Sequence, residues 1–339
     1  MLYVESLRDG LHEVFASNVE VVLLGEDVLD PYGGAFKVSR GLSEKFPNQV
    51  YATPISESAI VGLCTGLALR GFRPIGEIMF GDFLALCADQ IVNSAAKFPL
   101  MYGDNAQVPW VLRTPMGGAR GYGPTHSQSL EKLFFGVPGL DVVAPSRLHE
   151  PGALLKSTIL TCSRPTLFIE DKGDYPQPLI NGENGSLFVM DSPEPGSSST
   201  RLALNYDPSA HSPDVQVIAY GGAASMAADV LSKLKEEEIY GMLHAVAQLN
   251  DPLTLQALVE SLDPEVPLLI VEQGAEGFGW ASELISRRMT ALPRLTCPPL
   301  MTLAARSAAI PAAAHLEKDV IVTPEKIEAK VLEMLAKWS

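Results

Sequence analysis

The sequence predicts an α/β protein with two tandem domains, each built on a mostly parallel sheet. Short apolar runs alternate with segments of helical periodicity along most of the 339 residues. The alternation stops between residues 173 and 213, where Pro, Gly, Ser and Asn are frequent, and it starts again beyond them. We therefore expect a first domain over residues 1–172, a linker over 173–213 and a second domain over 214–339.

The first 172 residues carry the pattern in its clearest form. Ile60, Leu63, Cys64, Leu67 and Ala68 recur at the spacing of one helix face. A helix between short apolar runs is typical of β-α-β units, which place parallel strands in one sheet. The expected strands lie at 21–24, 74–80, 108–113, 141–144 and 166–170, and further helices near 82–97 and 150–161.

The region after residue 213 repeats this alternation. Its expected strands lie at 215–220, 242–249 and 267–272. Its expected helices lie near 223–237, after 253, at 280–289 and after 324. The region therefore predicts a second α/β domain with a sheet of its own.

Composition and charge exclude several classes of function. The chain is 47% hydrophobic and 19% charged, which is typical of a folded protein. Its formal net charge of −15, with Lys and Arg scattered, disfavours nucleic acid, which needs a basic surface. There is no apolar run of about eighteen residues and no signal-like N-terminus, so we expect a cytoplasmic protein that does not span a membrane.

Common metal and cofactor motifs are missing from the sequence. The four cysteines are far apart and form no CxxC pair, so we expect neither a zinc site nor a disulfide framework. They are Cys64, Cys87, Cys162 and Cys297. Phosphate-loop, hydrolase-elbow, zincin and dinucleotide signatures are also absent. The loop at 117–123 is rich in Gly but runs into Pro124 instead of a helix, so its spacing alone predicts a surface turn.

Several ordered segments of the first domain together form a recognisable pattern. The segments are GEDV at 25–28, GGAFKVSRGL at 33–42, TPISESAIVGLCTGLALRGFRPIGEI at 53–78, FGDFLALCADQIVNSAAK at 80–97, GGARGYGPTHSQSLEKLF at 117–134, PGLDVVAPS at 138–146 and PTLFIEDK at 165–172. Together they resemble one known family, the E1 β subunits of pyruvate, branched-chain and acetoin dehydrogenases. This resemblance covers nearly all of the first domain. It implies a transketolase-like domain that binds the pyrimidine end of thiamine diphosphate, followed by a transketolase C-terminal-like domain.

The resemblance places Glu57 where the family has the glutamate that hydrogen-bonds N1′ of the aminopyrimidine. A carboxyl group that exchanges a proton with N1′ helps the cofactor to lose its C2 proton. The residues alone permit another interpretation, because the helix dipole favours an acid after Ser56 without any function. Ile55, Ala59 and Ile60 are compatible with the apolar surroundings that a proton-exchanging carboxyl group needs.

Three further site residues are expected from the resemblance. Phe83 would stack on the pyrimidine ring, although its spacing also fits a core residue beside Leu86 and Cys87. Glu26 in the GEDV segment is expected among the cofactor-binding residues. His126 would line the channel to the cofactor and steer or protonate the acyl acceptor, a role that suits a side chain that titrates near neutral pH. A histidine in a loop is otherwise most often solvated.

The second domain resembles the family through DVQVIAYGGAASMAADVL at 214–231 and PLLIVEQGAEGFGWASELI at 267–285. In relatives this domain binds no cofactor and forms subunit interfaces. The chain also departs from the family pattern. The stretch 162–165 lacks the Asp and Asn that help relatives to hold a potassium ion, and we predict no metal site. Ala245-Val246-Ala247, Ser307 and Ala312 replace family residues in the second domain, which suggests a specialised member.

The resemblance implies a subunit that is incomplete alone. No segment resembles the GDG…NN motif that binds Mg²⁺ and the diphosphate, so an α subunit should supply both in an α₂β₂ assembly. The leading hypothesis is decarboxylation of a 2-oxo acid with acyl transfer to a lipoyl carrier on an E2 protein. A thiamine-dependent carboligase or acyltransferase, and a scaffold subunit without catalysis, remain as alternatives.

Overall fold

The computed structural model describes residues 1–338 apart from 104–105, 182–186, 192–199 and 292–297. Cys297 and most of the serine-rich stretch 197–200 lie outside the described residues. The chain forms two compact units. Unit 1 contains residues 1–116, 133–143 and 150–178, and unit 2 contains 117–132, 144–149 and 179–339.

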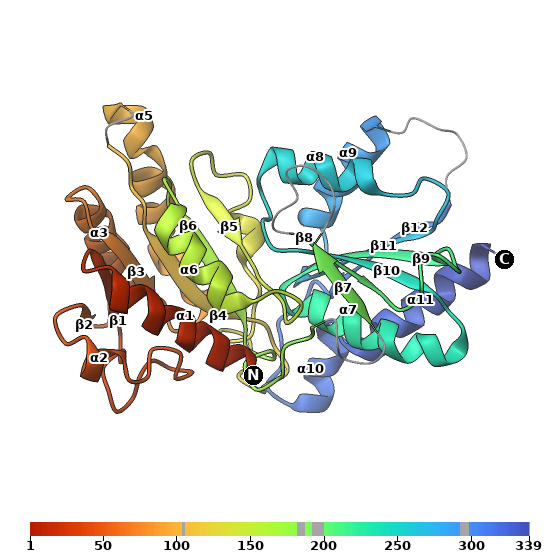
Figure 1. Ribbon diagram of the computed structural model, residues 1–339, viewed down its shortest axis with the longest axis horizontal. Helices are drawn as coiled ribbons and strands as arrows, with labels where there is room; N and C mark the ends of the chain where they lie inside the picture. The colour runs from red at the N-terminus through yellow and green to blue at the C-terminus, as the bar shows by residue number, and fades with distance from the viewer. Residues whose placement is uncertain (104–105, 182–186, 192–199, 292–297, 339) are drawn as a thin grey trace. The chain divides into compact units, whose positions relative to one another are not determined.

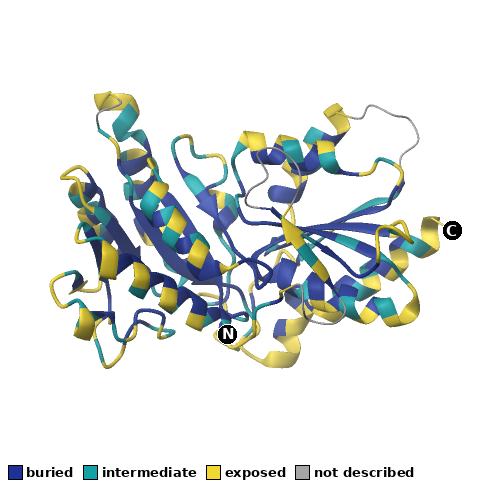
Figure 2. Cartoon of the chain, in the orientation of Figure 1, coloured by how far each residue is buried: buried dark blue, intermediate teal, exposed yellow. Residues whose placement is uncertain are grey.

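Unit 1 is built on a parallel sheet with the strand order β2-β1-β3-β4-β6-β5 among its described residues (Figure 1). The strands are β1 (Val21–Gly25), β2 (Val50–Ala52), β3 (Arg73–Glu77), β4 (Val111–Met116), β5 (Asp141–Val143) and β6 (Thr166–Asp171). Every residue of β1, β4 and β6 is buried, as expected for a parallel sheet with helices on both faces (Figure 2).

The helices of unit 1 occupy both faces of this sheet (Figure 1). They are α1 (Tyr3–Ser17), α2 (Leu42–Lys45), α3 (Glu57–Ala68), α4 (Leu84–Asp89), α5 (Phe98–Tyr102) and α6 (Pro151–Thr161), with short turns η1 (Gly81–Phe83), η2 (Gln90–Ser94) and η3 (Ala95–Lys97). α1 packs closely on α6, where the Gly152 N–H donates to Ser6 Oγ at 3.1 Å. α3 packs on α4, and Ser58 Oγ donates to the Leu86 carbonyl at 3.2 Å.

The expected helix over 82–97 is instead a succession of short turns. A 3₁₀ turn leads into α4, and a π-helical turn and another 3₁₀ turn follow. Apolar periodicity cannot separate these from a single helix, because each turn still directs its apolar residues to the same side. Phe83, the last residue of η1, thereby also begins the first turn of α4.

Unit 2 carries a mixed sheet with the order β12-β11-β9-β10-β8-β7 among its described residues. The strands are β7 (Phe188–Asp191), β8 (Thr200–Leu204), β9 (Val215–Tyr220), β10 (Gly241–Val246), β11 (Leu268–Ala275) and β12 (Leu300–Ala305). β9, β10, β11 and β12 run parallel to one another, whereas β8 runs antiparallel to β10 and to β7. Both antiparallel strands lie within the stretch 173–213, which the composition indicated as a linker. The domain limits drawn from the sequence stay predictions.

Helices cover this second sheet on both faces, with α8 and α9 on one and α7 and α11 on the other (Figure 1). The elements are α7 (Gly221–Leu234), α8 (Pro252–Ser261), α9 (Trp280–Ala291), α10 (Ala314–Val320) and α11 (Pro324–Trp338), with the turns η4 (Glu131–Leu133) and η5 (Lys235–Glu237). α8 begins after Asp251, whose Oδ2 accepts the Thr254 N–H at 2.8 Å, and Pro252 occupies the first helical position. Small residues of α7, among them Ala223, Ala224 and Ala227, pack in the core beneath the sheet.

The two sheets and their helices confirm the predicted α/β fold class. No helix in the described part of the chain is long and apolar enough to cross a membrane.

Candidate functional site

The first unit has a topological switch point at β1. The chain leaves β1 for β2 on one side and then reaches β3 on the other. Ligands of open parallel sheets bind at the carboxyl ends of the strands, near such a point. Glu26 directly follows β1, Glu57 follows β2 at the start of α3, and Phe83 follows β3. The sheet therefore gathers three of the predicted site residues at one edge.

Glu26 and Glu57 form a buried pair of carboxyl groups there. Glu26 is 6% and Glu57 7% exposed. The Ser56 backbone N–H bonds the Glu26 carboxyl group, while Glu26 Oε1 has no hydrogen-bond partner among the described residues. Burial raises the pKa of Glu26, the negative charge of Glu57 raises it further, and the Ser56 N–H opposes both. Two buried carboxyl groups thus lie together, and the pKa of Glu26 is raised above that of an exposed carboxyl group.

Phe83 directly precedes α4, the helix that packs on α3, and Glu57 is the first residue of α3. Its ring is half-buried and lies 5.8 Å from the Phe80 ring in an edge-to-face arrangement. The thiol of Cys87, one turn further, contacts the Phe83 carbonyl at 3.8 Å. Burial, and then the charge of Glu57, raise the pKa of Cys87 to about 12, which places Glu57 close to this turn. An aromatic side chain and two carboxyl groups therefore share one region.

A buried ion network fixes the strand ends under these loops. Arg113 Nη1 on β4 lies 2.9 Å from Glu77 Oε2 at the end of β3. Its Nε and Nη2 donate to the two oxygens of Glu170 on β6, and Tyr175 Oη donates to the same carboxylate at 2.7 Å. Burial raises the pKa of Glu77, whereas the Arg113 charge opposes this shift. Sequence reasoning missed the network, although charged residues inside apolar strands are a signal for one.

His126, the fourth predicted residue, belongs to the second unit. It lies in the segment 117–132 and is partly exposed. Its Nδ1 is 3.0 Å from Thr125 Oγ1, and its backbone N–H donates to the Gly123 carbonyl at 3.4 Å. The sequence assigned this segment to the domain over 1–172, whereas its contacts place it in unit 2.

The residues around Glu57 fit the edge of a flat, nitrogen-containing ring. A buried carboxyl group with an unbonded oxygen can exchange a hydrogen bond or a proton with ring and amino nitrogens. A half-buried phenyl ring supplies a flat apolar surface for such a group. Among the described residues, no group of three or more His, Cys, Asp or Glu side chains is arranged to hold a metal ion.

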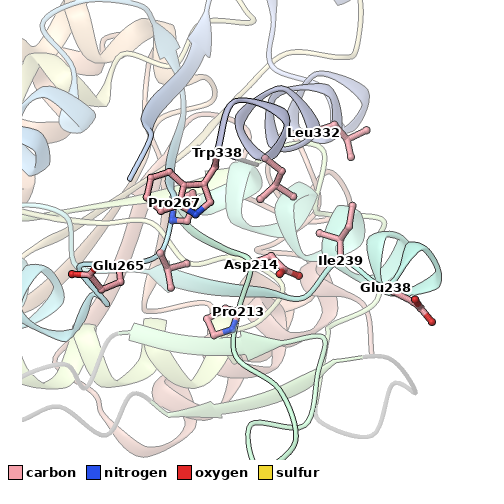
Figure 3. Close-up of a pocket in the computed structure, with 10 residues that line it drawn as sticks. Pro213, Asp214, Glu238, Ile239, Glu265, Pro267, Leu332 and Trp338 are labelled. Atoms are coloured by element: carbon pink, nitrogen blue, oxygen red, sulfur yellow. The ribbon is translucent and has the colours of Figure 1, made fainter. Parts of the chain in front are cut away.

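A separate pocket of about 470 Å³ lies in unit 2 (Figure 3). Leu332 and Trp338 of α11 line it together with Asp214, Glu238 and Pro267. These last three residues precede β9, β10 and β11, so the pocket lies at the amino ends of the strands. This is the edge opposite to the one at which parallel sheets bind ligands. None of the predicted site residues lines it.

Comparison with known proteins identifies relatives of this chain along almost its whole length. The family described as "Transketolase, pyrimidine binding domain" matches residues 1–178. The β subunit of acetoin:2,6-dichlorophenolindophenol oxidoreductase from Bacillus subtilis is 30% identical over 99% of this chain and 98% of its own length. The β subunit of 2-oxoisovalerate dehydrogenase from Bacillus subtilis is 32% identical over 98% of each chain. The pyruvate dehydrogenase E1 β subunit of Cyanidium caldarium is 30% identical over 99% and 98%.

Solved structures share the fold at lower identity. A split-gene transketolase, titled an inactive β4 tetramer, superposes with a TM-score of 0.72 at 17% identity and covers 100% of both chains. A Pichia stipitis transketolase in complex with sedoheptulose 7-phosphate has a TM-score of 0.67 at 16% identity, over 100% of this chain and 46% of that one. Fold and site thus define a transketolase-like α/β protein with a pyrimidine-binding domain. The chain belongs to the family of E1 β subunits of the 2-oxo acid dehydrogenases.

Proposed function

We propose that the chain is the β subunit of a heteromeric, thiamine diphosphate-dependent E1 enzyme that decarboxylates a 2-oxo acid and transfers the acyl group to a lipoyl carrier. At the level of residues, the main support for this function is the position of Glu57. Glu57, the first residue of α3, is buried beside Glu26 at the carboxyl ends of β1 and β2. The relatives named above are oxidoreductase and dehydrogenase subunits, which favours this function over a carboligase.

Each site residue has a proposed task. Thiamine diphosphate, when bound, supplies the carbanion-stabilising chemistry that decarboxylation of a 2-oxo acid needs. Glu57 holds and moves a proton at N1′ of the aminopyrimidine. Glu26, whose pKa is raised by burial and then by the charge of Glu57, lies beside it as a second carboxyl group. Phe83 presents an apolar face that orients the ring. His126 steers or protonates the acyl acceptor.

The rest of the cofactor site is assigned to a partner. We propose that an α subunit holds Mg²⁺ and the diphosphate, that two copies of each subunit form an α₂β₂ heterotetramer, and that a lipoyl E2 protein receives the acyl group. The basis is the sequence, which has no segment resembling the GDG…NN motif. We therefore expect negligible thiamine diphosphate binding by the isolated chain in calorimetry, and tight binding would contradict this division of the site.

The test of Glu57 uses the co-expressed α and β subunits. Glu57→Gln keeps the shape of the side chain but cannot exchange a proton, so turnover of a 2-oxo acid should fall by roughly 10²–10⁴-fold with assembly intact. Glu44→Gln is the matched control, because Glu44 also lies in the first turn of a helix but is exposed. Undiminished turnover of the Glu57→Gln complex would instead support a scaffold subunit.

A further inference from the structure

The loop that precedes His126 has an unusual backbone. Gly117, Ala119, Gly121 and Gly123 all have positive φ, at 94°, 65°, 69° and 79°. This alternation directs neighbouring N–H groups toward a common point, an arrangement that binds anions. Ala119 is the costly member, because a residue with a Cβ rarely adopts the left-handed conformation. Something must therefore stabilise the loop in this form.

Glu317 of α10 is the anion that the loop binds. Its Oε1 accepts the Ala119 N–H and its Oε2 the Gly121 N–H, both at 3.0 Å. The side chain is 2% exposed, so water competes little for these bonds. A Cβ added to Gly118 would lie 3.1 Å from Ile321 Cγ2, which shows how closely the loop lies on α10.

Glu317 is itself held in place. Its N–H donates to the Ala313 carbonyl at 2.9 Å, and its carbonyl accepts the Ile321 N–H at 3.0 Å. Lys326 Nζ donates to the Ile321 carbonyl at 2.6 Å and so ties the end of α10 to α11. Ile321 also belongs to a small buried apolar cluster under this helix. The carboxylate therefore presents a fixed pair of acceptors.

The other end of the segment is anchored in the same unit. Lys132 Nζ donates to the carbonyls of Ala275 at 2.8 Å and Gly277 at 3.0 Å. Tyr220 Oη donates to Glu131 Oε1 at 2.6 Å. His126 thus lies between two tethers, and the one at Glu317 acts directly on the strained loop.

We propose that Glu317 is a positioning residue for His126: it holds the 117–123 loop in its left-handed form and thereby fixes where His126 meets the acyl acceptor. Glu317 needs no contact with substrate or cofactor for this. The inference rests on the proposed function only for the task of His126. It gives the second domain, which lacks the pyrimidine site, a part in the acyl-transfer step.

The first test does not depend on activity. In the co-expressed pair, Glu317→Ala should speed amide hydrogen exchange of the peptide covering 117–126 by about tenfold or more, because two hydrogen bonds to a carboxylate are lost. Glu317→Gln should give a smaller increase, since one carbonyl acceptor remains, and it serves if the alanine variant fails to fold. Lys318→Ala, at the exposed next position of α10, is the control and should leave the peptide unchanged. Unchanged exchange in both Glu317 variants overturns the proposal.

The second test separates positioning from a general structural role. Glu317→Ala should slow acyl transfer to a lipoyl acceptor about tenfold while decarboxylation with an artificial electron acceptor is retained. Glu317→Ala combined with His126→Ala should transfer the acyl group no more slowly than His126→Ala alone. Both changes remove the same contribution, that of a correctly placed His126. Two outcomes overturn the proposal. One is that the losses of the two single variants add in the double variant, and the other is that Glu317→Ala slows decarboxylation as much as acyl transfer. If the wild-type pair turns over no 2-oxo acid, the proposed function fails, while the exchange experiment still decides whether Glu317 holds the loop.

Discussion

Arg113 and Glu170 form a two-pronged ion pair inside the first unit, with Nε 2.7 Å from Oε1 and Nη2 2.8 Å from Oε2. Both side chains are almost fully buried, at 3% and 0% exposure. Glu77 shares the same guanidinium, so one cation compensates two carboxyl groups. Removing the cation therefore leaves two acids in a region where water cannot replace it.

Arg113→Met should be strongly destabilising. We expect the free energy of unfolding to fall by about 3–5 kcal/mol, the usual result of breaking a buried ion pair by removing one partner. The matched control is Arg164→Met, whose pair with Asp141 at 2.9 Å is half-exposed on the arginine side. That change should cost less than about 1 kcal/mol. Urea unfolding of the two variants measures both, and equal losses would contradict the role given to the buried network.

Glu131 should make the second unit less stable as pH rises. Burial raises its pKa, and the hydrogen bond from Tyr220 only partly offsets this. The folded chain therefore keeps the proton to a higher pH than the unfolded chain does. The stability that this proton contributes is fully present below the ordinary carboxyl pKa. It is lost as pH rises through the pKa of Glu131 in the folded chain. Compared with wild type, Glu131→Gln should gain stability on going from pH 4 to pH 8, as measured by thermal unfolding.

Glu333 provides a control of opposite sign. Hydrogen bonds from Lys330 and Lys337 lower its pKa to about 2. Its contribution to stability is present above the ordinary carboxyl pKa and is lost as pH falls toward 2. Glu333→Gln should therefore lose stability at neutral pH and approach wild type in acid. If both variants shifted in the same direction with pH, the assignment for Glu131 would be wrong.

Much of the fold could be predicted because its signals are local. β9 begins and ends at the expected residues, since a Val- and Ile-containing run stands between polar and glycine residues. β7 gave no such signal, because its residues are mostly exposed and lie in a segment rich in Pro and Ser. It is a strand only through its pairing with β8. Contacts distant in sequence decide such elements.

The candidate site could likewise be predicted only in part from the sequence. Glu57 and Phe83 could be singled out because they stand in segments that resemble a family. The closeness of Glu26 to Glu57 could not, since it depends on β1 lying between β2 and β3. Arg113 bonds partners that lie 36 and 57 residues away in sequence. Charged residues inside apolar strands indicate that a buried network exists, but no local pattern identifies which residues pair.

Arg73 should stabilise the turn after α6. Its Nη1 donates to the carbonyls of Ile159 at 2.8 Å and Cys162 at 3.1 Å. Arg73→Met would leave both acceptors without this donor, and we expect a loss of about 1–3 kcal/mol in the free energy of unfolding. Arg70→Met, at a nearby exposed position, should change it by less than about 0.5 kcal/mol. Denaturant unfolding of both variants measures the difference, and an equally mild effect at Arg73 would refute the role of its hydrogen bonds.

His244 should make the chain sensitive to mild acid. It lies on β10, is 2% exposed, and neither ring nitrogen has a hydrogen-bond partner among the described residues. Burial lowers its pKa from 6.5 to about 4, because the charged imidazolium would lose its hydration. The folded chain thus excludes a proton that the unfolded chain binds.

The sign of the effect follows from that difference. The free energy of unfolding should be highest above pH 6.5 and fall by about 3 kcal/mol as pH drops toward 4. His244→Leu should remove this part of the slope and raise stability at pH 5, since an apolar side chain needs no hydrogen bonds there. His315→Leu, at an exposed position of α10, should leave the slope unchanged. Urea unfolding at pH 5 and pH 7 measures each slope, and a His244→Leu variant as acid-sensitive as wild type would show that the buried histidine is not the cause.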